Sequence, residues 1–179
     1  MNQLEILENN NPSIYVASLA HYNDGRLVGK WFDLVEHYDA ETLMKSIKEY
    51  ISELTLYGQP CEEYAIHGTN NIAFDVSEYA DIQTFEKIYK IMELQKDHDS
   101  DAIEAFFNIF GSDEDLENFE ESYQGKYDSE IDYAIEYVNG CYDIQKMLGN
   151  LSNYFDYKAF AKDLFYDYSF ENGHVFCSI

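Results

Sequence analysis

The segment 97–121 limits the possible folds of the chain most, because it is dense in negative charge and its apolar residues are also spaced as in a folded helix. It holds ten Asp and Glu residues and no Lys or Arg. Its apolar side chains recur at i, i+3, i+4 and i+7, which places them on one helix face; they are Ile103, Phe106, Phe107 and Phe110. The segment is therefore predicted to be a folded helix with a carboxylate-covered exterior.

The whole chain has the same character. Its 179 residues carry 35 Asp and Glu against 11 Lys and Arg, a net charge of −24, yet 17% of them are aromatic. Disorder requires low hydrophobicity and few aromatic residues, so a folded protein is expected. Such a charge destabilises the compact state by self-repulsion, which suggests that the acidic surface is itself functional. The alternative is that it serves only solubility or a salt-rich habitat.

The charge also restricts the partner. Direct binding to nucleic acid is disfavoured because phosphates are held by Lys and Arg, so the partner should be a basic protein. Duplex DNA carries one charge per about 1.7 Å of axis, so 24 charges match a duplex of roughly 40 Å. A dimer would match about twice that length.

The cysteines and the apolar runs indicate the compartment. Cys61, Cys141 and Cys177 form an odd set without a CxxC pair, which is typical of a reducing compartment. The start of the sequence lacks the basic and apolar regions of a signal peptide, and no apolar run is long enough to span a membrane. We expect a cytoplasmic protein without a membrane partner.

The predicted fold class is α+β, in an elongated chain of three small domains. The first, residues 1–73, should be a β-β-α-β unit, with strands over 13–19 and 27–32 around a turn at 21–26. A helix capped by Asp39 follows, and then a strand over 63–67. The pattern 58–60 (Gly-Gln-Pro) should stop the helix, and residues 69–71 should form a loop.

Residues 74–125 should form an acidic helical domain. Its helices are predicted to begin after Asp81, to cover 97–110, and to begin again at a capping box of Ser112 and Asp115. Residues 123–126 are expected to link this domain to the next.

Residues 126–179 should form an α+β domain suited to dimerisation, with helices over 129–138 and 151–165 and a strand over 175–179. The net charges of the three domains are −7, −12 and −5. The middle domain is thus the most acidic.

No catalytic or metal-binding pattern stands out. Asp97, Asp99 and Asp101 resemble the start of a calcium loop, but Ala102 and Asn108 occupy the positions of its Gly and its bidentate Glu. The histidines lack metal-ligand spacing, and no phosphate-binding or nucleophile motif occurs. We therefore predict a protein without catalytic residues, cofactor or metal.

The acids of segment 97–121 are the first set of candidate partner-binding residues. A charge run is usually only a solvated face, but an i,i+4 Lys would have relieved the repulsion here, and none is present. The candidates are Asp97, Asp99, Asp101, Glu104, Asp113, Glu114, Asp115, Glu117, Glu120 and Glu121.

Several blocks of the sequence resemble the ArdA antirestriction proteins. The first are IYVASL (14–19), YNDG (22–25) and LVGKWF (27–32), followed by EEYAIH (62–67). The block LSNYFDYKAFAKDL (151–164) is similar to the C-terminal signature of that family. The resemblance extends over about residues 13–179, and the middle part is matched mainly by its acidity and helical pattern.

The resemblance implies a binding function in which the protein catalyses no reaction. Members are DNA mimics of mobile elements, built from three domains, which dimerise through the C-terminal domain. They occupy the DNA-binding groove of type I restriction–modification enzymes and inhibit them stoichiometrically. The antirestriction motif would fall near 127–140, which adds Asp128, Glu130, Asp132 and Glu136 to the candidate partner-binding residues.

Two other functions remain open at this point. An acidic adaptor could bind another basic DNA-binding or regulatory protein, and only binding data separate it from a DNA mimic. An enzyme could use a carboxylate site, with or without a divalent metal, but charge spread over the whole chain disfavours a single such site.

Overall fold

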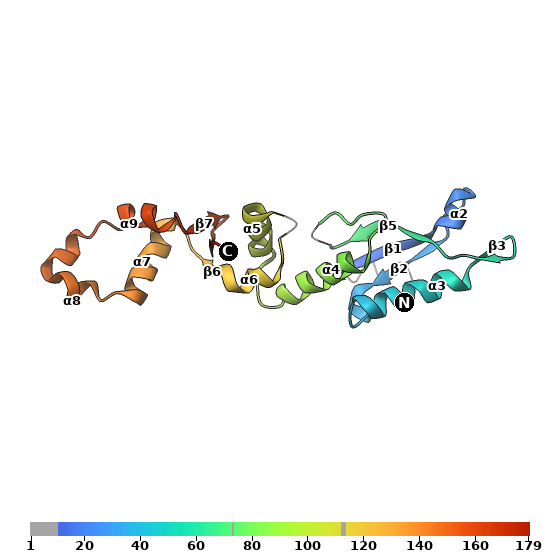
Figure 1. Ribbon diagram of the computed structural model, residues 1–179, viewed down its shortest axis with the longest axis horizontal. Helices are drawn as coiled ribbons and strands as arrows, with labels where there is room; N and C mark the ends of the chain where they lie inside the picture. Colours follow the sequence, from blue (N-terminus) through green and yellow to red (C-terminus); the bar gives the residue numbers. More distant parts are fainter. Residues whose placement is uncertain (1–10, 73, 112–113) are drawn as a thin grey trace. The chain divides into compact units, whose positions relative to one another are not determined.

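The computed structural model describes residues 11–72, 74–111 and 114–179 (Figure 1). The chain packs into two compact units, Met1–Met92 and Glu93–Ile179. Helices and antiparallel strands are mixed in both, which is consistent with the predicted α+β class. The division into three domains, 1–73, 74–125 and 126–179, stays a prediction.

A three-stranded sheet forms the base of the first unit. It has the order β2-β1-β5, with β1 (Ser13–Ser18) antiparallel to both β2 (Gly29–Asp33) and β5 (Tyr64–Asn70). The two strands predicted around the first turn therefore pair as expected. At Gly29, an added Cβ would lie 2.3 Å from the carbonyl oxygen of Val16, so only glycine fits this close approach.

Short elements join these strands. The predicted turn over 21–26 is partly helical, because α2 (Leu19–Asn23) precedes the glycine turn. A 3-10 helix, η1 (Leu34–Glu36), follows β2. Residues 58–60 were expected to stop the helix, but α3 already ends at Glu53. They belong instead to a small hairpin formed by β3 (Thr55–Leu56) and β4 (Gln59–Pro60).

Two capped helices cover the sheet. Helix α3 (Ala40–Glu53) begins at Asp39, which forms a capping box with Thr42, as the sequence predicts for its N-cap. Helix α4 (Ile82–Leu94) follows Asp81, whose Oδ1 accepts from the backbone N–H of Thr84 at 3.0 Å. Each cap satisfies a free N–H of a first helical turn.

The core of the first unit is largely aliphatic. Alternate residues of β1 meet the inner faces of α3 and α4, as strand and helix periodicities require. Its buried members include Ile14, Val16, Leu43, Ile47 and Ile88. Helix α4 thus packs on this core with Phe85 and Ile88, although its sequence lies in the predicted middle domain.

The second unit is built around another antiparallel sheet, of order β6-β8-β7. Its strands are β6 (Tyr123–Lys126), β7 (Tyr168–Glu171) and β8 (His174–Cys177), and helices α5 (Ser100–Phe110) and α6 (Glu117–Ser122) precede them in the chain. The expected linker over 123–126 is therefore a strand. The expected final strand is confirmed in β8, but its partner β7 was not predicted.

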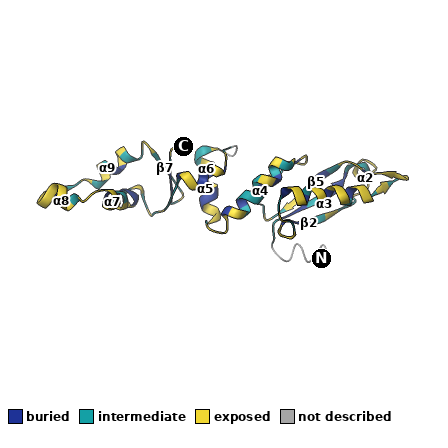
Figure 2. Ribbon diagram, turned by 60° about the horizontal axis from the view of Figure 1, so that its bottom comes forward, coloured by how far each residue is buried: buried dark blue, intermediate teal, exposed yellow. Residues whose placement is uncertain are grey.

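Four helical segments complete the second unit. They are α7 (Glu130–Cys141), α8 (Ile144–Leu148), the 3-10 helix η2 (Gly149–Tyr154) and α9 (Tyr157–Leu164). The single helix expected over 151–165 is wrong, because the chain leaves helical geometry after η2 and Asp156 caps α9 anew. Figure 2 shows the outer part of α8 exposed.

Some expectations fall outside the described residues. The capping box at Ser112 is one, and the candidate Asp113 is another. The described helix after them, α6, begins at Glu117, which is later than the predicted capping box implies. None of the helices in the described ranges has the length and apolarity that a membrane crossing requires.

Candidate partner-binding surface

Helix α5 divides its residues between a buried face and an acidic exterior. Ala102, Ile103 and Phe106 are buried, whereas Asp101 and Glu104 are exposed (Figure 2). Phe107 and Phe110, also expected inside, are half-buried. The helix begins after Asp99 rather than at residue 97, so Asp97 and Asp99 lie in the turn that leads into it.

A histidine ties this turn to α6. Nε2 of His98 lies 2.9 Å from Oε1 of Glu120, and its ring packs edge-on against Phe119 and Tyr123. The position of Glu120 is therefore fixed by contacts from an element 22 residues away. Sequence spacing alone gave no sign of this link.

The acids around α6 have different structural roles. Oδ1 of Asp115 accepts from the backbone N–H of Glu117 at 3.0 Å and so supports the start of the helix. Glu114 is half-buried and accepts from the side-chain amide of Asn118 at 2.7 Å. Glu117 and Glu121 are exposed on the same helix.

Helix α7 carries the acids that the family resemblance added. It is capped by Ser129, whose Oγ accepts from the backbone N–H of Asp132 at 3.2 Å. Glu130, Asp132 and Glu136 are exposed on it, and Asp128 is exposed just before it. The predicted helix over 129–138 is confirmed and continues to residue 141.

An aromatic core holds the acids of α5 and α6 in place. Phe106, Phe119 and Phe176 are fully buried, with ring centroids 5.5 to 5.8 Å apart. Tyr123 stacks on Phe119 at 5.2 Å. Because these rings join α5, α6 and β8, the exterior carboxylates stand on a closely packed support.

Tyr127 and Tyr133 of this unit add no charge near neutral pH. Burial raises the pKa of Tyr133, which packs against the rings of Tyr127 and Tyr168. Burial and the nearby carboxylate of Glu136 raise the pKa of Tyr127. These two hydroxyls therefore stay neutral beside the carboxylates of α7.

The candidate acids fall into two groups. Within the described residues, seven have no side-chain hydrogen bond or ion pair and are exposed: Asp97, Asp101, Glu104, Glu117, Glu121, Asp128 and Glu130. The others make local contacts, among them Asp99, which lies 3.7 Å from Nζ of Lys126. That contact is the one Lys–carboxylate pair of the second unit in the part of the chain described.

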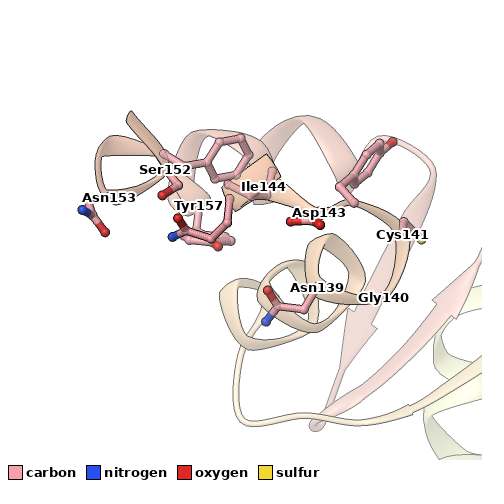
Figure 3. Close-up of a pocket in the computed structure, with 11 residues that line it drawn as sticks. Asn139, Gly140, Cys141, Asp143, Ile144, Ser152, Asn153 and Tyr157 are labelled. Carbon is pink, nitrogen blue, oxygen red and sulfur yellow. The ribbon is translucent and has the colours of Figure 1, made fainter. Parts of the chain in front are cut away.

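The structure also contains a pocket that the sequence did not indicate. It lies between the end of α7, α8 and η2, has a volume of about 790 Å³ and is lined by polar residues such as Asn139, Asp143 and Ser152 (Figure 3). The breaks at Asp143 and Gly149 that create it were the available signal. Across the described ranges, no group of three His, Cys, Asp or Glu is placed to hold a metal ion.

The fold and this surface define a densely acidic α+β protein with exposed carboxylates that have no side-chain partners among the described residues. The family model for the antirestriction protein ArdA matches residues 14–176. The chain therefore belongs to the ArdA antirestriction family, and the resemblance seen in its sequence is confirmed. No curated protein matches the chain. Membership implies an antirestriction function, with restriction–modification enzymes as protein partners.

Proposed function

We propose that the protein inhibits type I restriction–modification enzymes by mimicking DNA. The observation that carries this proposal is the set of seven exposed acids without side-chain partners among the described residues, on a unit with 20 acids and five Lys. Such carboxylates take the place of phosphates in a groove lined by Lys and Arg. The enzyme is then occupied stoichiometrically and no bond is made or broken.

Rigidity supports this mechanism. A disordered acidic tail would have to lose conformational entropy on binding, whereas the acids of α5 and α6 lie on helices packed around Phe106, Phe119 and Phe176. Preorganised charge also accelerates association with an oppositely charged groove, and this effect weakens as salt screens it. The proposed contact surface comprises the acids around α5 and α6 together with those around α7.

The exposed residues of α8 and η2 support a homodimer as the active form. Among the exposed residues of α8 and η2 are Met147, Leu148, Leu151 and Tyr154, an apolar set in an otherwise acidic protein. A second copy of the chain, covering these residues, would remove them from water and extend the acidic surface. We expect Met147→Ser with Leu151→Ser to shift the sedimentation coefficient toward the monomer. Tyr166→Ser, at a residue also exposed but outside this set, should leave it unchanged.

The proposed function is tested by displacement. The purified protein is titrated into a type I restriction enzyme bound to labelled DNA, at two salt concentrations. We expect release of the DNA near a stoichiometric ratio at low salt, and weaker release at high salt. If the folded protein released no DNA, this would contradict DNA mimicry and favour the acidic adaptor. The adaptor function would then be tested by using the protein to capture basic partners.

A further inference from the structure

Residues from two separate segments of the first unit form an exposed group with little net charge. We call it the Tyr57 cluster, and it consists of Tyr22, Asp24, Arg26, Leu27 and Tyr57. Tyr57, in the turn of the β3–β4 hairpin, is 77% exposed, Leu27 is 65% exposed and Tyr22 is 52% exposed. The charges of Asp24 and Arg26 cancel, so the cluster differs from the carboxylate surface of the second unit.

The cluster is ordered despite its exposure. The hydroxyl of Tyr57 donates to both carboxylate oxygens of Asp24, at 2.9 and 3.1 Å, across 33 residues of sequence. Nε of Arg26 lies 3.1 Å from the same carboxylate, and its guanidinium carbon lies 5.7 Å from the centre of the Tyr57 ring. The bond to Asp24 also raises the pKa of Tyr57, which keeps the hydroxyl a donor.

The backbone at Tyr57 points to a role beyond the turn. Its φ is 51°, in the left-handed region where Gly or Asn is favoured and an aromatic residue is strained. Gly58, with φ 81°, is the residue type such a hairpin prefers. A tyrosine in this position therefore costs stability, and its exposed ring gains little from packing within the chain. Tyr22 is likewise held, by an edge contact to the His67 ring at 4.5 Å.

The charge of the cluster identifies what it can contact, if the proposed function holds. A groove that binds DNA is lined by Lys and Arg, which attract free carboxylates but gain little from a cluster in which Arg26 already neutralises Asp24. Exposed tyrosine and arginine, held in one geometry, are the residue types that dominate protein–protein binding energy. We propose that the Tyr57 cluster binds an apolar protein surface of the same restriction enzyme, outside its DNA-binding groove.

This contact would divide the binding energy into two parts. Apolar burial by Tyr22, Leu27 and Tyr57 depends little on ionic strength, whereas the carboxylate contacts weaken as salt is added. The cluster would thus retain the inhibitor on the enzyme at salt concentrations that weaken the DNA-like contacts. It would also favour enzymes that carry the matching surface over other proteins with basic grooves.

The test uses Tyr57→Asn in the full-length protein. Asparagine suits the left-handed backbone, so the variant should keep or raise the melting temperature while it loses the ring. In the displacement assay we expect about a tenfold higher concentration for half-release of the DNA, at both salt concentrations. Leu27→Ser should shift it in the same direction, and Tyr38→Ala, at a residue 92% exposed in the same unit, should not shift it.

The outcomes separate this inference from the proposed function. Unchanged half-release by Tyr57→Asn and Leu27→Ser, with active wild type, overturns the Tyr57 cluster alone. If the variants lose inhibition at low salt but not at high salt, the cluster makes an electrostatic contact, and the proposed apolar contact is also overturned. No release by the wild type contradicts the proposed function, and the cluster inference is then overturned with it.

Discussion

The two units use their acids differently. In the first unit, several carboxylates stabilise the fold directly: buried Asp33 accepts from the backbone N–H of Val35 at 2.9 Å, and Asp39 and Asp81 cap helices. In the second unit Asp143 and Asp156 also cap helices, but most of the exposed candidate acids have no such task within the described residues. The net charges are −9 and −15, so the second unit also bears more repulsion.

The cores differ in the same sense. The first unit buries Ile and Leu side chains between a sheet and two long helices, which gives a conventional two-layer packing. The second has shorter elements and relies on aromatic rings, with Phe106, Phe119 and Phe176 at its centre. Large rings allow a small core to support a highly charged exterior, because each buries 150–250 Å².

The largest expected effect is on this aromatic core. Phe106→Ala should destabilise the second unit by about 3–5 kcal/mol, because it leaves a cavity among Phe119 and Phe176. Hydrogen exchange measured segment by segment should show faster exchange over Glu93–Ile179 and little change over Met1–Met92. Inhibition should be lost when the second unit unfolds.

Leu43→Ala gives the reverse comparison. It removes a fully buried side chain of the first unit and should cost about 2–5 kcal/mol there, with the second unit still protected. If either variant lowers protection throughout the chain, the two units fold as one, and the contrast between their cores has no independent consequence for stability.

The next largest effect concerns the free acids. Replacing three of them together, Asp101→Asn, Glu104→Gln and Glu117→Gln, should raise the concentration for half-release of DNA by roughly tenfold at low salt. This corresponds to about two- to threefold for each exposed ion pair lost. The effect should shrink at high salt. Removing like charges should not lower the melting temperature.

The matched control is a triple variant of the first unit. Glu41, Glu53 and Glu62 are also exposed, and their conversion to Gln removes the same charge. A smaller loss of inhibition is expected. An equal loss would mean that net charge alone matters and that the second unit has no special role. If Asp101→Asn alone abolished inhibition in a folded protein, a discrete site would replace the distributed surface.

Much of the first unit could be predicted, because its signals are local. The cap at Asp39, the helical spacing of Leu43 and Ile47, and the β-forming residues of 13–19 each act within a few residues. The second unit was harder. β6 and β7 are short strands that form only by pairing with β8, and such long-range pairing leaves little trace in the local sequence.

The candidate surface shows the same limit. Its acidity and the inner face of α5 could be predicted from composition and periodicity. The sequence did not reveal which acids lack a side-chain partner, because that depends on contacts such as those of His98 with Glu120 and of Lys126 with Asp99. These pairs are 22 and 27 residues apart in the sequence, so only the packed sheet and helices bring them together.

A smaller effect is expected from pH. Nδ1 of buried His174 lies 3.0 Å from the hydroxyl of Tyr123, while its Nε2 has no partner within the described residues. Burial and then the charge of Lys126 lower the pKa of His174 below 6.5, against the opposing influence of Asp99 and Asp101. The unfolded chain therefore takes up this proton more readily, so the stability of the second unit should fall as pH drops below about 6.5.

Thermal unfolding of the second unit, monitored by hydrogen exchange between pH 7.5 and pH 5, would check this. His174→Gln should flatten the pH dependence in that range, because the titrating group is removed. His37→Gln, in the first unit, should leave it unchanged. A dependence that persists in His174→Gln would assign the effect to other groups.

The smallest expected effect tests whether local charge matters more than total charge. Lys126→Gln removes the cation 3.7 Å from Asp99, so one more carboxylate becomes available to a basic groove. Because the pair is exposed, inhibition should tighten only by about twofold at low salt. Lys146→Gln, on α8, makes the same change in net charge away from these acids. Equal tightening by both variants would show that the partner responds to overall charge. Tightening by Lys126→Gln alone would locate the contact at the start of α5, where the free acids of the second unit begin.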